Sequence, residues 1–324
     1  MVKSLVYALT IGLGLVLMPW FASAQSTDRS AMNQWLTMTQ NQKDIPVGTV
    51  INMSNWQQYK DVMPLGMIKL FQGQYGWKMP ADVQIPVGPS HVGGNLPQTW
   101  VSATEKYGSQ TQVKVLPDGH YELLNYYGGT PFPNPQEPHK GWKILANVFW
   151  AYVPALYVNS PNNYGTVWAV DRFGDIAPSS LDVIYRLSSY ITDPGFPHEE
   201  TYAPGTWYTE WGMQETPEQA RYTASLSLFY KDQETNPYPD TYVFVPALRR
   251  SLRLSSSSRC SPVFGFDWTY DDAKTNGFNG STSVYTADYL GDRKILTLSE
   301  FNTEGGAFPQ GYDMPLGWPE TIVG

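Results

Sequence analysis

The sequence predicts a mainly β protein with some α-helix, an α+β fold built around antiparallel strands. Aromatic residues make up 15% of the chain and charged residues only 15%, whereas coiled coils and helical bundles need long charged faces. The 28 glycines and 26 prolines favour turns over long helices. Two stretches between residues 218 and 254 alternate with a period of two, as half-buried strands do. The 324 residues suffice for a sizeable core.

Residues 1–24 are predicted to be a signal peptide that is cleaved after Ala24. Lys3 supplies the positive start, an apolar run follows, and Ala22-Ser23-Ala24 gives the small-x-small cleavage pattern before Gln25. An uncleaved membrane anchor is the alternative, but the run is short for a span, which needs about 20 residues. The residue directly after the cleavage point is Gln25 and not a cysteine, so a lipid anchor is not predicted. The mature chain, residues 25–324, is expected to be one soluble periplasmic domain.

The chain is acidic, with a formal net charge of −8. Such a surface repels nucleic acid and anionic membranes over long range, so nucleic acid is not an expected partner. Four arginines nevertheless cluster, Arg249, Arg250, Arg253 and Arg259. They form either a solvated strand face beside carboxylates or a docking site for an acidic partner or lipid head group. The single cysteine, Cys260, excludes an internal disulfide and is expected to be buried or half-buried.

Short helices and a loop are predicted for the N-terminal third. Residues 25–43 form a loose or helical lead-in. Residues 52–61 begin a helix at Ser54 or Asn55, because no helix breaker follows until Pro64. Residues 63–75 form an irregular helix or strand, and the prolines and glycines between residues 78 and 97 predict a loop.

The middle of the chain contains the clearest hairpin. Residues 111–116 and 120–127 alternate around the turn Pro117-Asp118-Gly119. The glycines and prolines of residues 128–135 then predict a rigid loop. Residues 142–156 are apolar and form either a buried helix or a strand, because the pattern does not separate the two. Residues 166–173 are predicted to be a strand.

The two alternating stretches are expected to pair as antiparallel strands. Residues 218–230 have one apolar and one polar face. In residues 241–254 the alternation continues past Pro246, which predicts a single strand with a basic second face that includes Arg249 and Arg253. In the first stretch, the residues that share the face predicted to be apolar are Tyr222, Ala224, Leu226, Leu228 and Tyr230. In the second stretch, the corresponding face contains Leu248, Leu252 and Leu254 together with Arg250. A last strand is expected at residues 295–298.

Catalytic and metal-binding patterns are sparse, so we expect no enzyme activity, no metal and no cofactor. The four histidines lack the spacing of a zinc site. Asp267, Asp271 and Asp272 do not follow the ligand spacing of a calcium loop. Nucleophile-elbow, phosphate-binding and dinucleotide-binding motifs do not occur. A pair of carboxylates for glycoside chemistry is left open, because its spacing is set by the fold.

The aromatic inventory is large, with 12 Trp, 22 Tyr and 13 Phe. These residues either fill the core or line an apolar cavity enclosed by a curved sheet. If a cavity exists, the alternating stretches and the apolar segment from residue 142 supply its candidate lining: Trp142, Tyr222, Leu226, Leu228, Phe244, Leu252 and Leu254.

The chain resembles the outer-membrane lipoprotein-sorting (LolA/LolB-like) superfamily, and more closely a large proteobacterial domain-of-unknown-function family assigned to it. In the superfamily pattern, a strand that ends in a proline and a paired basic segment precedes a Gly-x-Asp-aromatic-x-Tyr-x-Asp stretch. The residues that carry the resemblance are Gly129–Pro135 (GTPFPNP), Trp142-Lys143, Tyr242–Arg253, Phe264–Asp272 and Phe278-Asn279-Gly280.

The resemblance implies an unclosed antiparallel β-barrel wrapped around a few helices, with an apolar cavity. It also implies a non-catalytic carrier of a lipid or other lipophilic ligand, serving an inner-membrane exporter or an outer-membrane component. Members of the family usually continue past the position of Gly324, so closing strands are not all expected within residues 25–324. The closer family has no settled ligand, so lipoprotein transfer itself is not carried over.

Two loops, at residues 85–97 and 128–138, are candidates for a movable cover over the cavity. Two other functions are left open by the sequence. One is a periplasmic carbohydrate-binding or carbohydrate-cleaving protein that uses exposed aromatic rings. The other is a scaffold of the cell envelope that docks an acidic partner through Arg249, Arg250 and Arg253.

Overall fold

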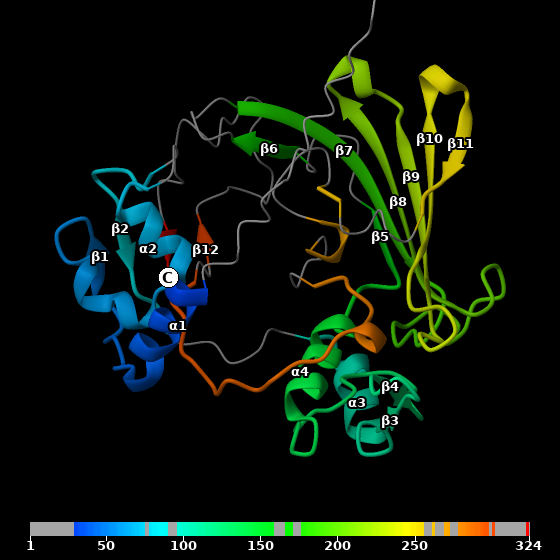
Figure 1. The fold of residues 1–324 in the computed structure, drawn as a ribbon, viewed down its shortest axis with the longest axis horizontal. Helices are drawn as coiled ribbons and strands as arrows, with labels where there is room; N and C mark the ends of the chain where they lie inside the picture. The colour runs from blue at the N-terminus through cyan, green and yellow to red at the C-terminus, as the bar shows by residue number, and fades with distance from the viewer. Residues whose placement is uncertain are drawn as a thin grey trace, which may run out of the picture.

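The computed structural model describes residues 29–74, 78–89, 96–158, 166–170, 176–255, 261–262, 269–272, 278–297, 300–301 and 322–323. The predicted signal peptide, Arg259, Cys260 and Phe264–Trp268 lie outside this part of the chain. Figure 1 shows a curved sheet with two helices at its lower end, and a separate group of short helices opposite. No helix in the described ranges is long and apolar enough to cross a membrane.

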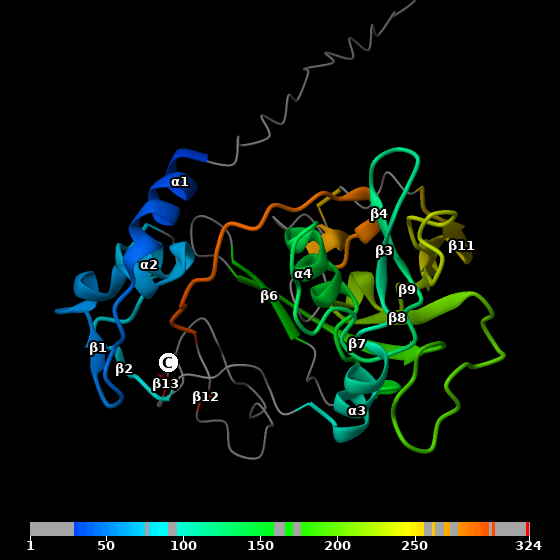
Figure 2. The ribbon, with the colours of Figure 1, turned by 90° about the horizontal axis from the view of Figure 1, so that it is seen from below.

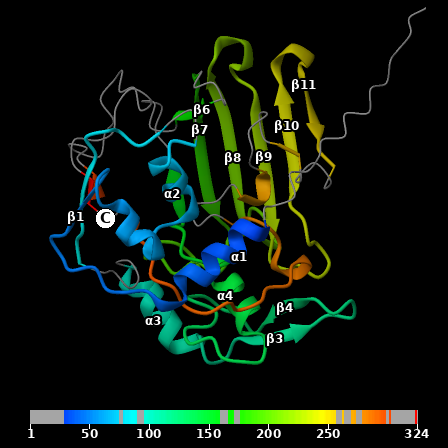
Figure 3. The same cartoon turned by 60° about the vertical axis from the view of Figure 1, so that its left-hand side comes forward.

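The main sheet has seven antiparallel strands in the order β11-β10-β9-β8-β7-β5, with β6 also paired to β7. The two ends of this order are not paired to each other among the described strands, so the sheet is open (Figures 1 and 3). This confirms the predicted α+β class with an unclosed antiparallel sheet. The strands are β5 (Leu156–Val158), β6 (Thr166–Val170), β7 (Ile176–Leu187), β8 (Thr206–Thr216), β9 (Ala224–Tyr230), β10 (Asp240–Val245) and β11 (Arg250–Arg253).

The remaining elements are short. The α-helices are α1 (Arg29–Met38), α2 (Leu65–Phe71), α3 (Gln98–Tyr107) and α4 (Lys140–Phe149). Three pairs of strands are β1 (Val50–Asn52) with β2 (Gln84–Pro86), β3 (Gln112–Val115) with β4 (Tyr121–Leu124), and β12 (Glu300–Phe301) with β13 (Ile322–Val323). The 3-10 turns are η1 (Thr39–Asn41), η2 (Trp56–Val62), η3 (Glu218–Ala220), η4 (Pro246–Leu248), η7 (Tyr270–Asp272) and η8 (Thr282–Val284).

Most of the predicted local elements are confirmed. The lead-in contains helix α1, and the predicted helix after Asn55 is the 3-10 turn η2. The predicted hairpin is β3–β4, closed by the Leu116 N–H donating to the His120 carbonyl at 2.8 Å. The undecided apolar segment is helix α4, which buries Trp142, Ala146 and Phe149 on one face and is followed by β5. Strand β6 lies within the predicted strand of residues 166–173.

Three predicted strands are wrong in extent or type. Residues 218–230 are not one strand, because η3 and the left-handed backbone of Tyr222 (φ 65°) precede β9. Residues 241–254 form a hairpin, since η4 begins at Pro246 and Arg249 (φ 50°) reverses the chain between β10 and β11. Residues 295–297 form no strand. The Leu296 N–H donates to the Val62 carbonyl at 2.6 Å instead, and the Leu296 side chain is buried beside η2.

The buried apolar residues form two clusters. One belongs to the N-terminal group and contains Ile51, Trp56 and Met63 together with Leu296. The other joins helix α4 to the lower end of the main sheet through Trp142, Phe149, Trp207, Tyr208 and Phe229. Figures 1 and 2 show the segment from η8 to Leu296 running between the two groups. Residues far apart in the sequence therefore complete both cores.

The loop of residues 128–135 is fixed against α3 and α4. A Cβ atom at Gly129 would lie 2.4 Å from the Thr104 backbone nitrogen. The Thr130 N–H donates to Thr104 Oγ1 at 2.8 Å. The Asn147 amide accepts from the Phe132 N–H at 2.9 Å and donates to the Phe132 carbonyl at 2.7 Å. These contacts confirm the predicted rigid loop and argue against its second predicted role as a moving cover.

Candidate ligand-binding site

The main sheet has a concave face that packs on α4 and a convex face on the opposite side (Figure 1). Tyr208 and Phe229 mark the concave face, because both lie in the core cluster with Trp142 and Phe149 of α4. Cross-strand pairing extends this face outward from the core. Its described members beyond the core are Tyr157, Leu181, Val183, Tyr185, Glu210, Gly212, Gln214, Ser225, Ser227, Thr241, Val243, Val245, Arg250, Leu252 and Leu254.

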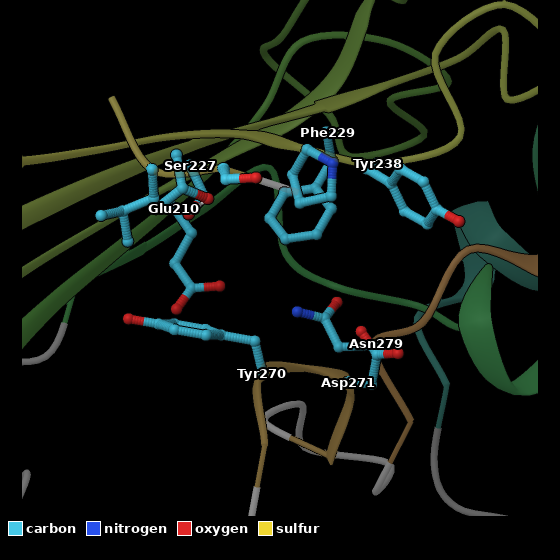
Figure 4. A pocket seen from close by; sticks show the side chains of 11 residues that line it. Glu210, Ser227, Phe229, Tyr238, Tyr270, Asp271 and Asn279 are labelled. Carbon is cyan, nitrogen blue, oxygen red and sulfur yellow. Dashed lines mark hydrogen bonds between the residues drawn. The ribbon is translucent and has the colours of Figure 1, made fainter. Parts of the chain in front are cut away.

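A cavity of about 30 Å³ lies between this face and the segment that contains η7. Figure 4 shows it from close by, with the Glu210 carboxylate opposite the ring of Tyr270. Since a water molecule needs roughly 10–15 Å³ of such space, the cavity holds about two waters in this conformation. Its lining combines apolar, aromatic and polar side chains: Glu210, Ser227, Phe229, Tyr238, Pro239, Thr241, Leu254, Ser255, Tyr270, Asp271 and Asn279.

Hydrogen bonds hold residues 270–272 and 278–285 against the sheet. The Tyr208 hydroxyl donates to Asn279 Oδ1 at 2.7 Å, and the Tyr285 hydroxyl donates to the Asp271 carboxylate. Trp142 Nε1 donates to the Thr282 carbonyl at 2.9 Å, which connects this segment to the buried face of α4. The covering segment is therefore attached to both the sheet and the helix.

Gln233, in the loop between β9 and β10, adds a buried polar connection to the same segment. Its Oε1 accepts from Thr282 Oγ1 at 2.8 Å, and its backbone carbonyl accepts from Ser283 Oγ at 2.8 Å. The Gln233 N–H donates to Glu122 Oε1 of β4 at 2.9 Å. One residue of the β9–β10 loop thus links the β3–β4 hairpin and η8 through its side chain and its backbone.

Tyrosines around the cavity remain neutral. Burial first, and the nearby Glu210 carboxylate second, raise the pKa of Tyr185, Tyr208 and Tyr270 above the usual tyrosine value. A hydrogen bond with Glu210 adds to the effect at Tyr185. These phenols act as hydrogen-bond donors at neutral pH, as Tyr208 does toward Asn279.

The structure separates the predicted cavity-lining residues into three places. Leu252 and Leu254 lie on the concave face, and Leu254 lines the cavity. Trp142 is buried in the α4 core at 1% exposure. The other four do not face the cavity. Leu226, Leu228 and Phe244 lie on the convex face, and Tyr222 is half exposed before β9 begins.

This correction has a simple physical cause. Alternation separates the two faces of a strand but does not show which face meets the core. In β9 the buried residues are Ser227 and Phe229, whereas Leu226 is 37% exposed. The face that contains serines is the inner one, because Phe229 stacks on Tyr208 with ring centroids 4.2 Å apart.

The predicted docking arginines do not share one surface. Arg253 pairs with Asp240 on the convex side. Arg250 is exposed and belongs to the concave side of β11, and Arg249 occupies the turn after η4. Arg253 therefore fits the solvated face beside a carboxylate, and a docking role for the three stays a prediction.

Sequence reasoning missed Glu210, Phe229, Tyr238 and Asn279 as cavity residues. Asn279 lies in the Phe278-Asn279-Gly280 motif of the family resemblance, which was a usable signal. Glu210 lies on β8, which together with β7 was not predicted as a strand at all. Within the described ranges, no group of three His, Cys, Asp or Glu side chains is placed to hold a metal ion.

Comparison with known proteins identifies a family. A sequence profile of the family described as "Protein of unknown function (DUF1329)" matches residues 50–305. The chain is similar to a "putative outer membrane lipoprotein-sorting protein domain" from Vibrio parahaemolyticus, at 17% identity and TM-score 0.29, over 41% of this chain and 47% of that one. It is also similar to a DUF1329 family protein from Desulfovibrio piger ATCC 29098, at 16% identity and TM-score 0.34, over 47% and 54%. The chain spans about half the length of these two structures. No curated protein matches it.

Proposed function

The chain belongs to the DUF1329 family, as the resemblance predicted, and we propose that it is a non-catalytic binding protein that carries a lipophilic ligand on the concave face of its sheet. The observation that supports this proposal is a set of apolar side chains on the concave surface beyond the α4 core, on either side of polar residues such as Glu210 and Ser227. Val183 and Tyr185 lie there on β7, Val243 on β10 and Leu252 on β11, with Leu254 directly after β11, and each is only half buried.

An alkyl chain against this surface would gain free energy mainly by leaving water. Each buried methylene contributes about 0.8 kcal/mol, so roughly ten methylenes gain about 8 kcal/mol. The ordering of ligand and side chains offsets part of this gain. Binding of this kind needs no covalent chemistry, which agrees with the sparse catalytic patterns of the sequence.

Ligand entry requires a conformational change. The cavity of about 30 Å³ has no space for an alkyl chain, so Tyr270 and the residues beside it have to move away from the sheet. In the proposed cycle, the segment that contains η7 covers the concave face when the protein is empty. When the protein has bound its ligand, the same segment lies over the ligand. The bonds from Tyr208 to Asn279 and from Tyr285 to Asp271 are the contacts that would have to break or shift.

The proposed place of action is the periplasm, on the basis of the signal-peptide pattern in residues 1–24. The proposed partners are an inner-membrane exporter or an outer-membrane component that supplies or receives the ligand. The proposed location is tested by determining the N-terminal residue of the protein recovered from a periplasmic fraction, which should be Gln25.

Mass spectrometry of organic extracts tests the proposed function. The protein is purified from the periplasm without detergent, extracted, and compared with an extract of an unrelated periplasmic protein prepared in the same way. We expect a lipophilic compound close to one equivalent per chain. A protein that is empty, and that also binds no added alkyl probe, would contradict the carrier proposal.

A further inference from the structure

A second concave feature lies on the surface of α3, away from the main sheet cavity. It is a shallow, open groove of about 390 Å³. Figures 1 and 2 place α3 next to the β3–β4 hairpin, at the end of the molecule where α4 lies. The lining residues are Gln98, Thr99, Ser102, Ala103, Lys106, Tyr107, Tyr127, Ile191, Thr192 and His198.

Three aromatic rings form one side of the groove. The rings of Tyr127 and His198 are stacked, with centroids 4.0 Å apart and planes 10° apart. The ring of Tyr107 lies 4.4 Å from that of Tyr127. His198 is fixed in turn, because its Nδ1 donates to the Ile191 carbonyl at 3.1 Å. Tyr127 is nevertheless 46% exposed, so this packed array faces solvent and does not fill a core.

The rest of the lining comes mainly from one face of helix α3, whose last residue is Tyr107 itself. Gln98, Ser102 and Lys106 are spaced four residues apart, so they lie above one another along the helix. They provide an amide, a hydroxyl and an ammonium group, and Thr99 and Thr192 add hydroxyls. Neutral hydrogen-bonding groups beside aromatic rings are suited to a ligand that has both apolar C–H faces and hydroxyl groups, which is the chemistry of a sugar.

The charge of the groove differs from that of the whole chain. The chain has a net charge of −8, yet none of the residues that line the groove is a carboxylate. Lys106 is protonated at neutral pH, as lysines ordinarily are. A hydrogen bond to Tyr107 raises its pKa further, and its Nζ lies 4.9 Å from the Tyr107 ring centroid. A positive group in an otherwise neutral groove favours a ligand with a negative charge.

We propose that the α3 groove binds an acidic sugar, with the aromatic array of Tyr107, Tyr127 and His198 contacting the ring and Lys106 contacting the carboxylate. This site is separate from the concave face of the sheet and does not depend on the carrier function. It also gives a specific location to the carbohydrate-binding function that the sequence left open.

Calorimetric titration of the full chain with glucuronate, glucose and acetate tests the proposal. We expect glucuronate to bind about tenfold more tightly than glucose, and acetate to show no saturable binding. Lys106→Met should remove the preference for glucuronate over glucose. Tyr127→Ala should weaken both sugars at least tenfold.

Two matched variants control for general effects. Lys69→Met removes a lysine from the last turn of α2, as Lys106→Met does in α3. Tyr222→Ala removes a tyrosine of similar exposure, 50% against 46% for Tyr127. Both should bind glucuronate like the unmodified protein. The proposal is overturned if glucuronate does not bind saturably, if acetate binds as tightly as glucuronate, or if the control variants lose as much affinity as the groove variants.

Discussion

Gly129→Ala tests how tightly the GTPFPNP loop packs on α3. The added Cβ would lie 2.4 Å from the Thr104 nitrogen and 2.7 Å from its Cα, and Gly129 has φ +79°. The left-handed backbone costs an alanine about 1 kcal/mol. Overpacking against a fixed backbone costs up to about 3 kcal/mol, because a main chain cannot rotate away as a side chain can. Together these effects should lower the free energy of unfolding by about 4 kcal/mol.

Gly119→Ala is the matched control. Gly119 has φ +88° in the β3–β4 turn, and nothing lies within 4 Å of an added Cβ. It should lose only the backbone contribution, about 1 kcal/mol. Urea denaturation followed by tryptophan fluorescence and circular dichroism gives both values. If Gly129→Ala costs no more than Gly119→Ala, the loop is not packed on Thr104 and the account of a fixed loop is wrong.

Two further predictions concern stability. Asn147→Ala should destabilise the protein by about 2–4 kcal/mol in urea denaturation, because the N–H and the carbonyl of Phe132 both lose their partner; an unchanged midpoint would contradict this. Burial raises the pKa of Tyr126, Tyr185 and Tyr208 above that of tyrosine in the unfolded chain. The stability that these neutral phenols contribute should therefore be complete below the unfolded tyrosine pKa of about 10, and it should be lost as the pH rises above that value. Unfolding measured over an alkaline pH series should show this loss, with a shallower slope for Tyr185→Phe, and a slope unaffected by that change would refute it.

The sequence predicts best those elements whose cause is local. The Pro117-Asp118-Gly119 turn and the alternation around it are enough to specify the β3–β4 hairpin, including its pairing. The glycines and prolines of residues 128–135 are enough to indicate a rigid loop. The sequence does not decide between a helix and a strand for the segment that forms α4, because a short apolar run is compatible with either.

The faces of the main sheet depend on contacts that are distant in sequence. Phe229 faces inward because Tyr208 and α4 meet it there, and the alternation of β9 alone indicates equally well that the Leu226 face is buried. The β10–β11 turn was hidden because the alternation resumes after it, although Pro246 and Arg249 mark its position. The cavity combines Glu210 of β8 with Asn279, and no local pattern links these two positions.

Ligand binding by a matched pair of variants tests the central claim most directly. Leu252 and Leu226 lie on opposite faces of the sheet, so Leu252→Asp places a carboxylate on the concave face and Leu226→Asp places one on the convex face. The concave variant loses about 1.5–3 kcal/mol of apolar contact and must also desolvate a charge. Fluorescence titration with dansylundecanoic acid, after circular dichroism has shown both variants folded, should give at least roughly 100-fold weaker binding for Leu252→Asp and unchanged binding for Leu226→Asp. Equal effects of the two substitutions, or a loss caused by Leu226→Asp alone, would contradict binding on the concave face.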